Sequence, residues 1–108
     1  MDRLLATRTA IVTTLNEYAQ LHRRDRVETV ALCDPTTDNY LLLNIGWKHN
    51  QRIHDIVIHL RIINHQIQVE WNGTDTLIDD LIDRGIPATD FITSQLEPQL
   101  EPQPAERV

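Results

Sequence analysis

The spacing of apolar residues predicts a helix at the start of the chain, over residues 3–22. The residues that form its apolar stripe recur at helical intervals: Leu4, Ile11, Leu15 and Tyr18. A basic cluster follows at positions 22–24, where positive charge complements the dipole at the C-terminal end of a helix. We expect this cluster to be a solvated helix stop, with a small phosphate contact as the alternative.

Alternating and β-branched segments after this helix predict four β-strands. The expected strands cover residues 27–34, 40–48, 52–63 and 66–71. Residues 35–39 are rich in turn formers, and Asn64 with His65 suits a two-residue loop. Because strands joined by such short connections pair antiparallel, we expect these four to form a meander.

The turns also predict the register of the meander. With a two-residue loop at Asn64 and a four-residue loop at residues 48–51, apolar residues face apolar residues throughout. The expected pairs are Ile62 with Ile67, Leu60 with Val69, Ile58 with Trp71, Leu43 with Ile56 and Leu41 with Ile58. Both hairpins send the even-numbered side of the third strand into the core. A slip by one residue would bury Arg61 instead.

The opposite face of this predicted sheet is more apolar than a face in water should be. Its expected members are Tyr40, Leu42, Asn44, Gly46, Ile53, Asp55, Val57, His59, Arg61, Gln68 and Glu70. On this face Leu42 would lie opposite Val57, and Ile53 would lie near Gly46. We therefore expect either helix packing over part of the face or self-association through it or through a sheet edge.

A second helix is expected over residues 75–84, with Gly85 at its C-terminal cap. Pro87 then starts a short turn or helix that reaches Phe91 and Ile92. The helix has an apolar stripe on one side, formed by Leu77, Ile78, Leu81 and Ile82.

The segment 96–103 repeats Leu-Glu-Pro-Gln twice, a composition that cannot bury a core. The expected organisation is a single domain over residues 1–94 and an extended or disordered tail over residues 95–108. The fold class is α+β, with an N-terminal helix, a four-stranded antiparallel β-meander and one or two C-terminal helices.

Charge is unevenly distributed along the 108 residues. Residues 1–72 carry eight acids and eight Lys or Arg residues, whereas residues 73–108 carry eight acids and two Arg residues. The net charge of −6 therefore belongs to the C-terminal third. DNA phosphates are bound by clustered Lys and Arg, so we expect contact with DNA to be at most indirect. An acidic region suits a basic protein partner better.

Composition also bears on the compartment. A single cysteine, Cys33, cannot form an internal disulfide, which fits a reducing cytoplasm. No apolar run approaches the ~18–20 residues of a membrane span, and the first residues lack the features of a signal peptide. We expect a cytoplasmic protein without membrane contact.

Candidate catalytic and metal-binding groups do not converge in the predicted register. His59 and Glu70 are expected to be cross-strand neighbours, but Asp55 lies four strand residues from His59, or ~13 Å. Metal ligands must lie about 2 Å from one ion, so these three cannot share it. Cys33 has no His nearby, and no phosphate-binding loop or nucleophile motif is present. We expect no cofactor and no enzymatic activity.

Two sets of residues are instead candidates for contact with a partner. Asp79, Asp80 and Asp83 lie on one side of the second predicted helix, as a solvated face or as a docking surface for Arg and Lys. Trp47 ends a strand, where a half-exposed Trp is a common interface anchor, although packing at the rim of the core is the alternative. Trp71 is expected to pack in the core against Ile58.

Four short motifs carry a family resemblance. Gly46-Trp47 ends one predicted strand and Arg52-Ile53 opens the next. Asn72-Gly73-Thr74-Asp75 precedes the second helix, which ends in Gly85-Ile86-Pro87. In order and spacing, from about Leu4 to Ile92, the chain resembles the XisI-type fdxN element excision controlling factors of cyanobacteria. After Ile92 it departs from the aromatic-His-x-Pro segment with which that family continues.

The resemblance implies an accessory role in site-specific excision of a DNA element, in which a recombinase performs the strand chemistry. It also implies an XisH-like protein of nuclease fold as partner. The alternative is a regulator or antitoxin-like partner of an XisH-type protein with no role in recombination. The candidate surface combines the second sheet face, the Trp47–Arg52 loop and the acidic helix.

Overall fold

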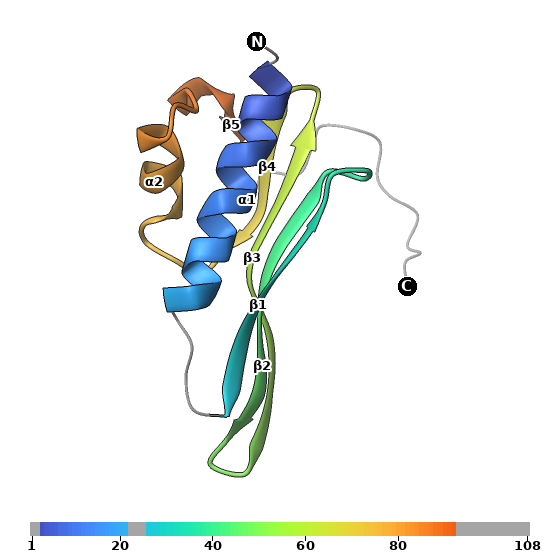
Figure 1. The fold of residues 1–108 in the computed structure, drawn as a ribbon, viewed down its shortest axis with the longest axis vertical. Helices are drawn as coiled ribbons and strands as arrows, with labels where there is room; N and C mark the ends of the chain where they lie inside the picture. The colour runs from blue at the N-terminus through green and yellow to red at the C-terminus, as the bar shows by residue number, and fades with distance from the viewer. Residues whose placement is uncertain (1–2, 22–25, 93–108) are drawn as a thin grey trace, which may run out of the picture.

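The computed structural model describes residues 3–21 and 26–92 of the chain. Within them, five strands form one sheet in the order β1-β2-β3-β4-β5, with two α-helices packed on it (Figure 1). The elements in chain order are α1 Arg3–Leu21, β1 Val27–Asp34, β2 Asn39–Lys48, β3 Gln51–Ile63, β4 Gln66–Asn72, α2 Leu77–Asp83, the 3₁₀ helix Ala88–Asp90 and β5 Phe91–Ile92. The predicted basic cluster at positions 22–24 and the tail over 95–108 lie outside the described residues.

The α+β class and the antiparallel order of the first four strands are confirmed, but the expected strand count was wrong. The additional strand, β5, pairs parallel to β4 through Ile67 with Phe91 and Gln68 with Ile92. A strand of two residues offers no alternation that a sequence could show. The predicted short turn after Pro87 exists as the 3₁₀ helix that leads into β5.

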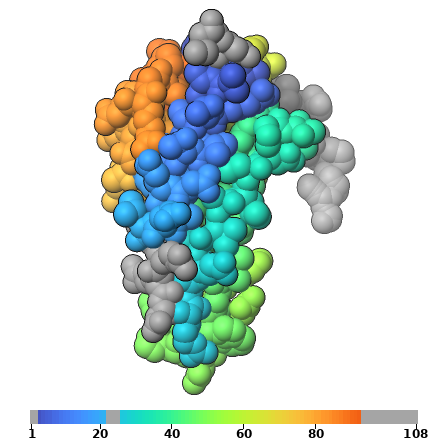
Figure 2. Space-filling view, viewed as in Figure 1, coloured from blue at the N-terminus to red at the C-terminus, as the bar shows by residue number. Residues whose placement is uncertain are grey.

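Helix α1 packs on the sheet through the predicted stripe. Ile11 and Leu15 are completely buried, Tyr18 is nearly so, and Leu4 packs against the same cluster. Figure 2 shows α1 (blue) with α2 (orange) beside it, and the far end of the sheet (teal and green) extends beyond both helices. The C-terminal end of α1 therefore marks the limit of the covered part of the sheet.

Helix α2 is shorter than the predicted range 75–84 and buries only Leu77 and Leu81 of its four apolar residues. At its start the Thr74 hydroxyl accepts the backbone N–H of Leu77 at 3.2 Å. At its end Gly85 has φ +106°, a conformation that side chains other than glycine rarely adopt. The predicted glycine cap is therefore confirmed.

Two hairpin turns join β2 to β3 and β3 to β4. The first turn consists of His49 and Asn50 and the second of Asn64 and His65, and all four residues have positive φ. Turns of this kind match the right-handed twist of the strands. The predicted loop at residues 48–51 is thus shorter by two residues, because Lys48 and Gln51 pair with each other. The register next to both turns is as predicted.

The register of the β2–β3 pair shifts between Leu42 and Leu43. Leu43 pairs with Ile56 as predicted, but Ile58 pairs with Leu42 and not with Leu41. Val57 is the extra residue of a β-bulge, and its carbonyl oxygen accepts the N–H of Gly73 at 2.8 Å. The bulge places Ile56 and Ile58 on opposite faces, so the prediction that Ile56 lies in the core was wrong.

A second shift separates His59 from Leu60 in the β3–β4 pair. Leu60 pairs with Val69 as predicted, whereas Ile58 pairs with Asn72 and not with Trp71. The shift turns Trp71 away from the helices, and its side chain is 59% exposed. The expectation of a buried Trp71 against Ile58 was therefore wrong.

The core lies between the sheet and the two helices. Its sheet residues are Tyr40, Leu42, Ile58, Leu60, Ile62, Ile67 and Val69. Tyr40 and Leu42 are 0% and 1% exposed, so the prediction that they belong to a second, uncovered face was also wrong. The bulge at Val57 explains the error, since it reverses the side of β3 that meets each residue of β2.

A partly buried polar network ties α1 to the β1–β2 turn. The Arg8 guanidinium donates two hydrogen bonds to the Asp38 carboxylate, at 2.9 and 3.0 Å. The Tyr40 hydroxyl donates a third to the same carboxylate at 2.7 Å. The guanidinium lowers the pKa of Asp38, while burial raises the pKa of Tyr40. Asp38 thus holds a helix, a turn and a core side chain together.

Substitution of Ile58 and Ile56 by alanine tests the bulge at Val57. Ile58→Ala should lower the free energy of unfolding by about 2–5 kcal/mol, because it opens a cavity in the core. Ile56→Ala, at a position 47% exposed, should change it by about 0.5 kcal/mol or less. Urea unfolding of both variants in dilute solution is the measurement. Equal losses in the two variants would indicate that both isoleucines are buried, as in the uninterrupted register, and would contradict the bulge.

The Asp38 network predicts a stability that depends on pH. The folded-state pKa of Asp38 is lowered, so its contribution is complete above the unfolded value of about 3.9 and is lost as the pH falls through the folded value. Asp38→Asn should therefore destabilise the protein at pH 7, and this loss should shrink below about pH 4. Urea unfolding at pH 7 and pH 3 measures it, with Asp55→Asn as an exposed control. A loss that is the same at both pH values would contradict the network.

Candidate functional site

The face of the sheet that points away from α1 and α2 carries a broad set of apolar side chains. The strand registers place these residues on it: Val30, Leu32, Leu41, Leu43, Ile45, Trp47, Ile56 and Trp71. We call this surface the open face. Its most exposed members are Leu32 (52%), Ile56 (47%) and Trp71 (59%). Contiguous exposed apolar side chains make this face a candidate interaction site.

The hairpin end of the open face is formed by Trp47 and Arg52, which pair across β2 and β3. The Arg52 guanidinium lies 5.5 Å from the centre of the Trp47 ring, at cation–π distance. Arg52 also donates a hydrogen bond to the Gly46 carbonyl at 3.3 Å. Trp47 is 44% exposed, so its indole ring is held in place but remains accessible.

The other end of the open face is polar. His59 Nε2 lies 2.9 Å from the Asn39 side-chain oxygen, and its partner on β4 is Trp71. The predicted pairing of His59 with Glu70 was wrong, because Glu70 is the extra residue at the second register shift and its carboxylate lies 3.6 Å from Arg61. His59 Nε2 therefore contacts Asn39, and the Glu70 carboxylate contacts Arg61.

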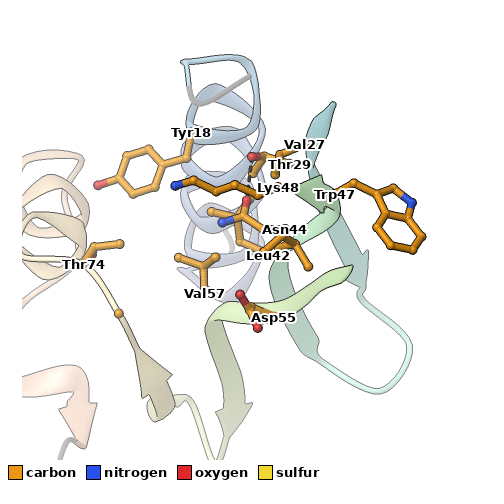
Figure 3. A pocket seen from close by; sticks show the side chains of 12 residues that line it. Tyr18, Val27, Thr29, Leu42, Asn44, Trp47, Lys48, Asp55, Val57 and Thr74 are labelled. Atoms are coloured by element: carbon orange, nitrogen blue, oxygen red, sulfur yellow. Dashed lines mark hydrogen bonds between the residues drawn. The ribbon is translucent and has the colours of Figure 1, made fainter. Parts of the chain in front are cut away.

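A separate hollow of about 600 Å³ lies on the helix side of the sheet, beyond the end of α1. Its walls include Val57 and Ile53 from β3 and Asn44 from β2, whose side-chain oxygen accepts the Thr29 hydroxyl at 2.7 Å. Figure 3 shows Val57 and Leu42 on its floor, while the Trp47 indole turns outward, away from it. Ile53 and Val57 therefore lie on the helix side and not on the open face.

Two close approaches of the backbone explain the glycines of the sequence motifs. A Cβ on Gly46 would lie 2.0 Å from the carbonyl oxygen of Arg26, which accepts the N–H of Trp47. A Cβ on Gly73 would lie 3.1 Å from the Val57 carbonyl oxygen at the bulge. Both glycines thus allow hydrogen bonds that fix the shape of the sheet.

The acidic residues of α2 differ in their environment. Asp79 and Asp83 are exposed, whereas the Asp80 carboxylate accepts a short hydrogen bond from the Tyr18 hydroxyl of α1. Burial and this hydrogen bond raise the pKa of Tyr18. Arg84, the basic residue that follows α2, is paired with Glu17. Two of the three predicted docking carboxylates are therefore free to meet a partner, and Asp80 has a structural contact.

The described residues show no group of three His, Cys, Asp or Glu side chains that could hold a metal ion. Cys33 packs against the core from β1, and burial raises the pKa of its thiol. Among the helices within residues 3–21 and 26–92, none combines the length and the hydropathy that a membrane span requires.

The ten residues of the predicted partner surface do not form one patch. Trp47, Arg52 and His59 lie on the open face, and Asp79, Asp80 and Asp83 lie on α2. The remaining four belong to the core or to the hollow: Tyr40, Leu42, Ile53 and Val57.

Sequence reasoning missed the apolar centre of the open face: Leu41, Leu43, Ile45, Ile56 and Trp71. Consecutive apolar residues, such as Tyr40–Leu43 and Ile56–Ile58, gave the only signal. Such runs are compatible with either side pointing inward.

The sheet and its one-sided helix layer define a small α+β protein with one apolar sheet face that the helices do not cover. The sequence model of the XisI protein family matches residues 1–103. The chain therefore belongs to the XisI family.

Two solved structures from Anabaena variabilis ATCC 29413 are similar. An XisI-like protein has 28% identity and a TM-score of 0.80, over 89% of this chain and 90% of the other. The fdxN element excision controlling factor XisI has 31% identity and a TM-score of 0.75, over 90% and 96%. A search of curated proteins gave no significant match.

The different environments of Asp80 and Asp79 predict different effects of alanine. Asp80→Ala removes the acceptor of the Tyr18 hydroxyl and should lower the free energy of unfolding by about 1–3 kcal/mol. Asp79→Ala, on the exposed side of the same helix, should change it by about 0.5 kcal/mol or less. Thermal or urea unfolding compares the two, and the Tyr18→Phe background should abolish most of the difference. If Asp80→Ala and Asp79→Ala lower the free energy of unfolding equally when Tyr18 is present, Asp80 does not form the hydrogen bond with Tyr18.

Proposed function

We propose that this protein controls the excision of a DNA element and that it acts by binding another protein. The observation that carries the proposal is the likeness to the Anabaena variabilis excision controlling factor, at 31% identity over nearly the whole of both chains. Membership of the XisI family over residues 1–103 supports it.

The distribution of charge favours binding to protein over direct binding to DNA. The exposed side of α2 carries Asp79 and Asp83, and Asp75 precedes the helix. The basic residue nearby, Arg84, is engaged with Glu17. Since a phosphate backbone is attracted by unpaired Lys and Arg, this side would repel DNA and attract a basic protein surface. We therefore place the excision chemistry on other proteins.

The partner that we propose is an XisH-like protein, in line with the family resemblance of the motifs. The acidic side of α2 would contact Lys and Arg residues on it. Asp80 has a different role in this proposal, because its carboxylate fixes α2 to Tyr18 and so orients Asp79 and Asp83. Complementary charge of this kind increases the association rate and excludes acidic surfaces.

Co-expression with the XisH-like protein of the same genome tests this proposal. We expect a complex that co-purifies and that Asp79→Lys and Asp83→Lys each weaken, with a smaller dependence on salt in the variants. Asp55→Lys makes the same charge change at an exposed acid of β3 and should leave the complex intact. Equal loss in all three variants would point to net charge and not to α2.

Two further outcomes would contradict the proposal in different ways. Tight, salt-sensitive binding of bare DNA without a protein complex would contradict both the charge argument and the partner. If the complex forms but excision of the element is the same with and without this protein, the alternative is favoured: the protein regulates an XisH-type protein and has no role in recombination. An excision assay with and without this protein separates these cases.

A further inference from the structure

The open face combines a large apolar centre with charges of both signs. Glu28 and Asp34 lie on it from β1, Arg52 and Arg61 lie on it from β3, and the Glu70 carboxylate of β4 lies 3.6 Å from Arg61. The acidic helix α2 lies on the opposite side of the sheet (Figure 1). Two copies could therefore bring their open faces together without bringing their acidic helices together.

We propose that the open face binds a second copy of this chain, sheet against sheet, about a two-fold axis that runs along β2, so that β1 of each copy lies over β3 of the other. This is an isologous dimer, in which the same surface of each copy meets itself. Two sheets packed in this way align within about 30° and lie about 10 Å apart.

The charges of the open face are complementary under this symmetry. Asp34 pairs with Asn39, and Asn39 pairs with Arg61, so Asp34 and Arg61 lie at one level along the sheet. A rotation about an axis parallel to the strands keeps the level and exchanges the two sides of the sheet. Asp34 of one copy then approaches Arg61 of the other. Near the opposite end, Glu28 is level with His54, two residues along β3 from Arg52, so Glu28 of one copy approaches the Arg52 side chain of the other at an offset of about 7 Å along the strands.

The size of the open face also suits a second copy. Strands lie about 4.8 Å apart and rise about 3.3 Å per residue, so β1, β2 and β3, at about ten residues each, present a flat area on the order of 500 Å². A stable interface buries about 800 Å² per partner, which is of the same order.

Both tryptophans of the chain lie on the open face, so their fluorescence reports on its occupancy. Trp71 and Trp47 are 59% and 44% exposed in the single copy. Dimerisation should shift their emission to shorter wavelength and protect them from acrylamide as the protein concentration rises. The helices contain no tryptophan, so a contact elsewhere would not produce this signal.

Analytical ultracentrifugation of the purified full-length protein tests the dimer, with 12.5 kDa as the mass of a single copy. We expect twice this mass, and we expect Leu32→Lys to raise the dissociation constant by about 100-fold or more, because it buries an unpaired charge. Leu5→Lys is the matched control: Leu5 on α1 is 54% exposed against 52% for Leu32, and its variant should remain a dimer. Ile56→Lys, at the centre of the face, provides a second disruptive variant.

Charge exchange tests the axis itself. Glu28→Arg and Arg52→Glu should each weaken the dimer, and the double variant should recover most of the loss. Circular dichroism and urea midpoints confirm that the variants fold. A monomer at all concentrations, or a dimer that tolerates both Leu32→Lys and Ile56→Lys, would overturn the proposal.

The test is independent of the XisH-like partner, because it uses this protein alone. Asp79→Lys should leave the dimer unchanged, so that failure of the partner proposal and failure of the dimer give different results.

Discussion

The β-bulge at Val57 determines which side chains of the sheet meet the helices. Its carbonyl oxygen accepts the N–H of Gly73, and a side chain on Gly73 would press against that oxygen. The extra residue lets Ile58 enter the core while Ile56 points outward. Tyr40 and Leu42 can therefore close the core under α1. The whole division of the sheet into a covered and an open face depends on this one hydrogen-bonded irregularity.

Helix α1 holds the covered face together through polar contacts near both of its ends. Near its start, Arg8 joins the Asp38 carboxylate at the β1–β2 turn. Near its end, the Tyr18 hydroxyl contacts both Thr76 and Asp80 of the α2 region. Hydrogen bonds to charged groups contribute more than neutral ones, and they also fix direction. The position of α2, and with it the acidic surface, follows from the position of α1.

The result is a molecule with two sides of different chemistry. The helix side presents the exposed carboxylates Asp79 and Asp83, and the open face presents aliphatic and indole side chains. Apolar burial is non-directional and tolerates a second copy of the same surface, whereas charge discriminates between partners. A dimer through the open face would leave both acidic helices accessible, one at each side of the assembly. Partner binding and self-association therefore need not compete.

The sequence by itself determined the first helix, the first four strands and the register next to the two hairpin turns. The stripe of Ile11, Leu15 and Tyr18 defined α1, and the turn residues Asn64 and His65 fixed the pairing of the strands beside them. These are local features, since a helix stripe or a two-residue turn needs only neighbours in the chain. The motif glycines and the family resemblance also came from the sequence, and the family match confirmed the latter.

Only the tertiary structure decided which face of the sheet is buried. The runs Tyr40–Leu43 and Ile56–Ile58 are apolar on both sides, so alternation could not show where the register changes. The Val57 bulge is fixed by Gly73, a residue 16 positions later, and β5 exists only because β4 offers it an edge. The register shift at Glu70 was equally invisible in the sequence. Because a shift of one residue reverses the side on which the following residues point, Trp71 was wrongly expected in the core.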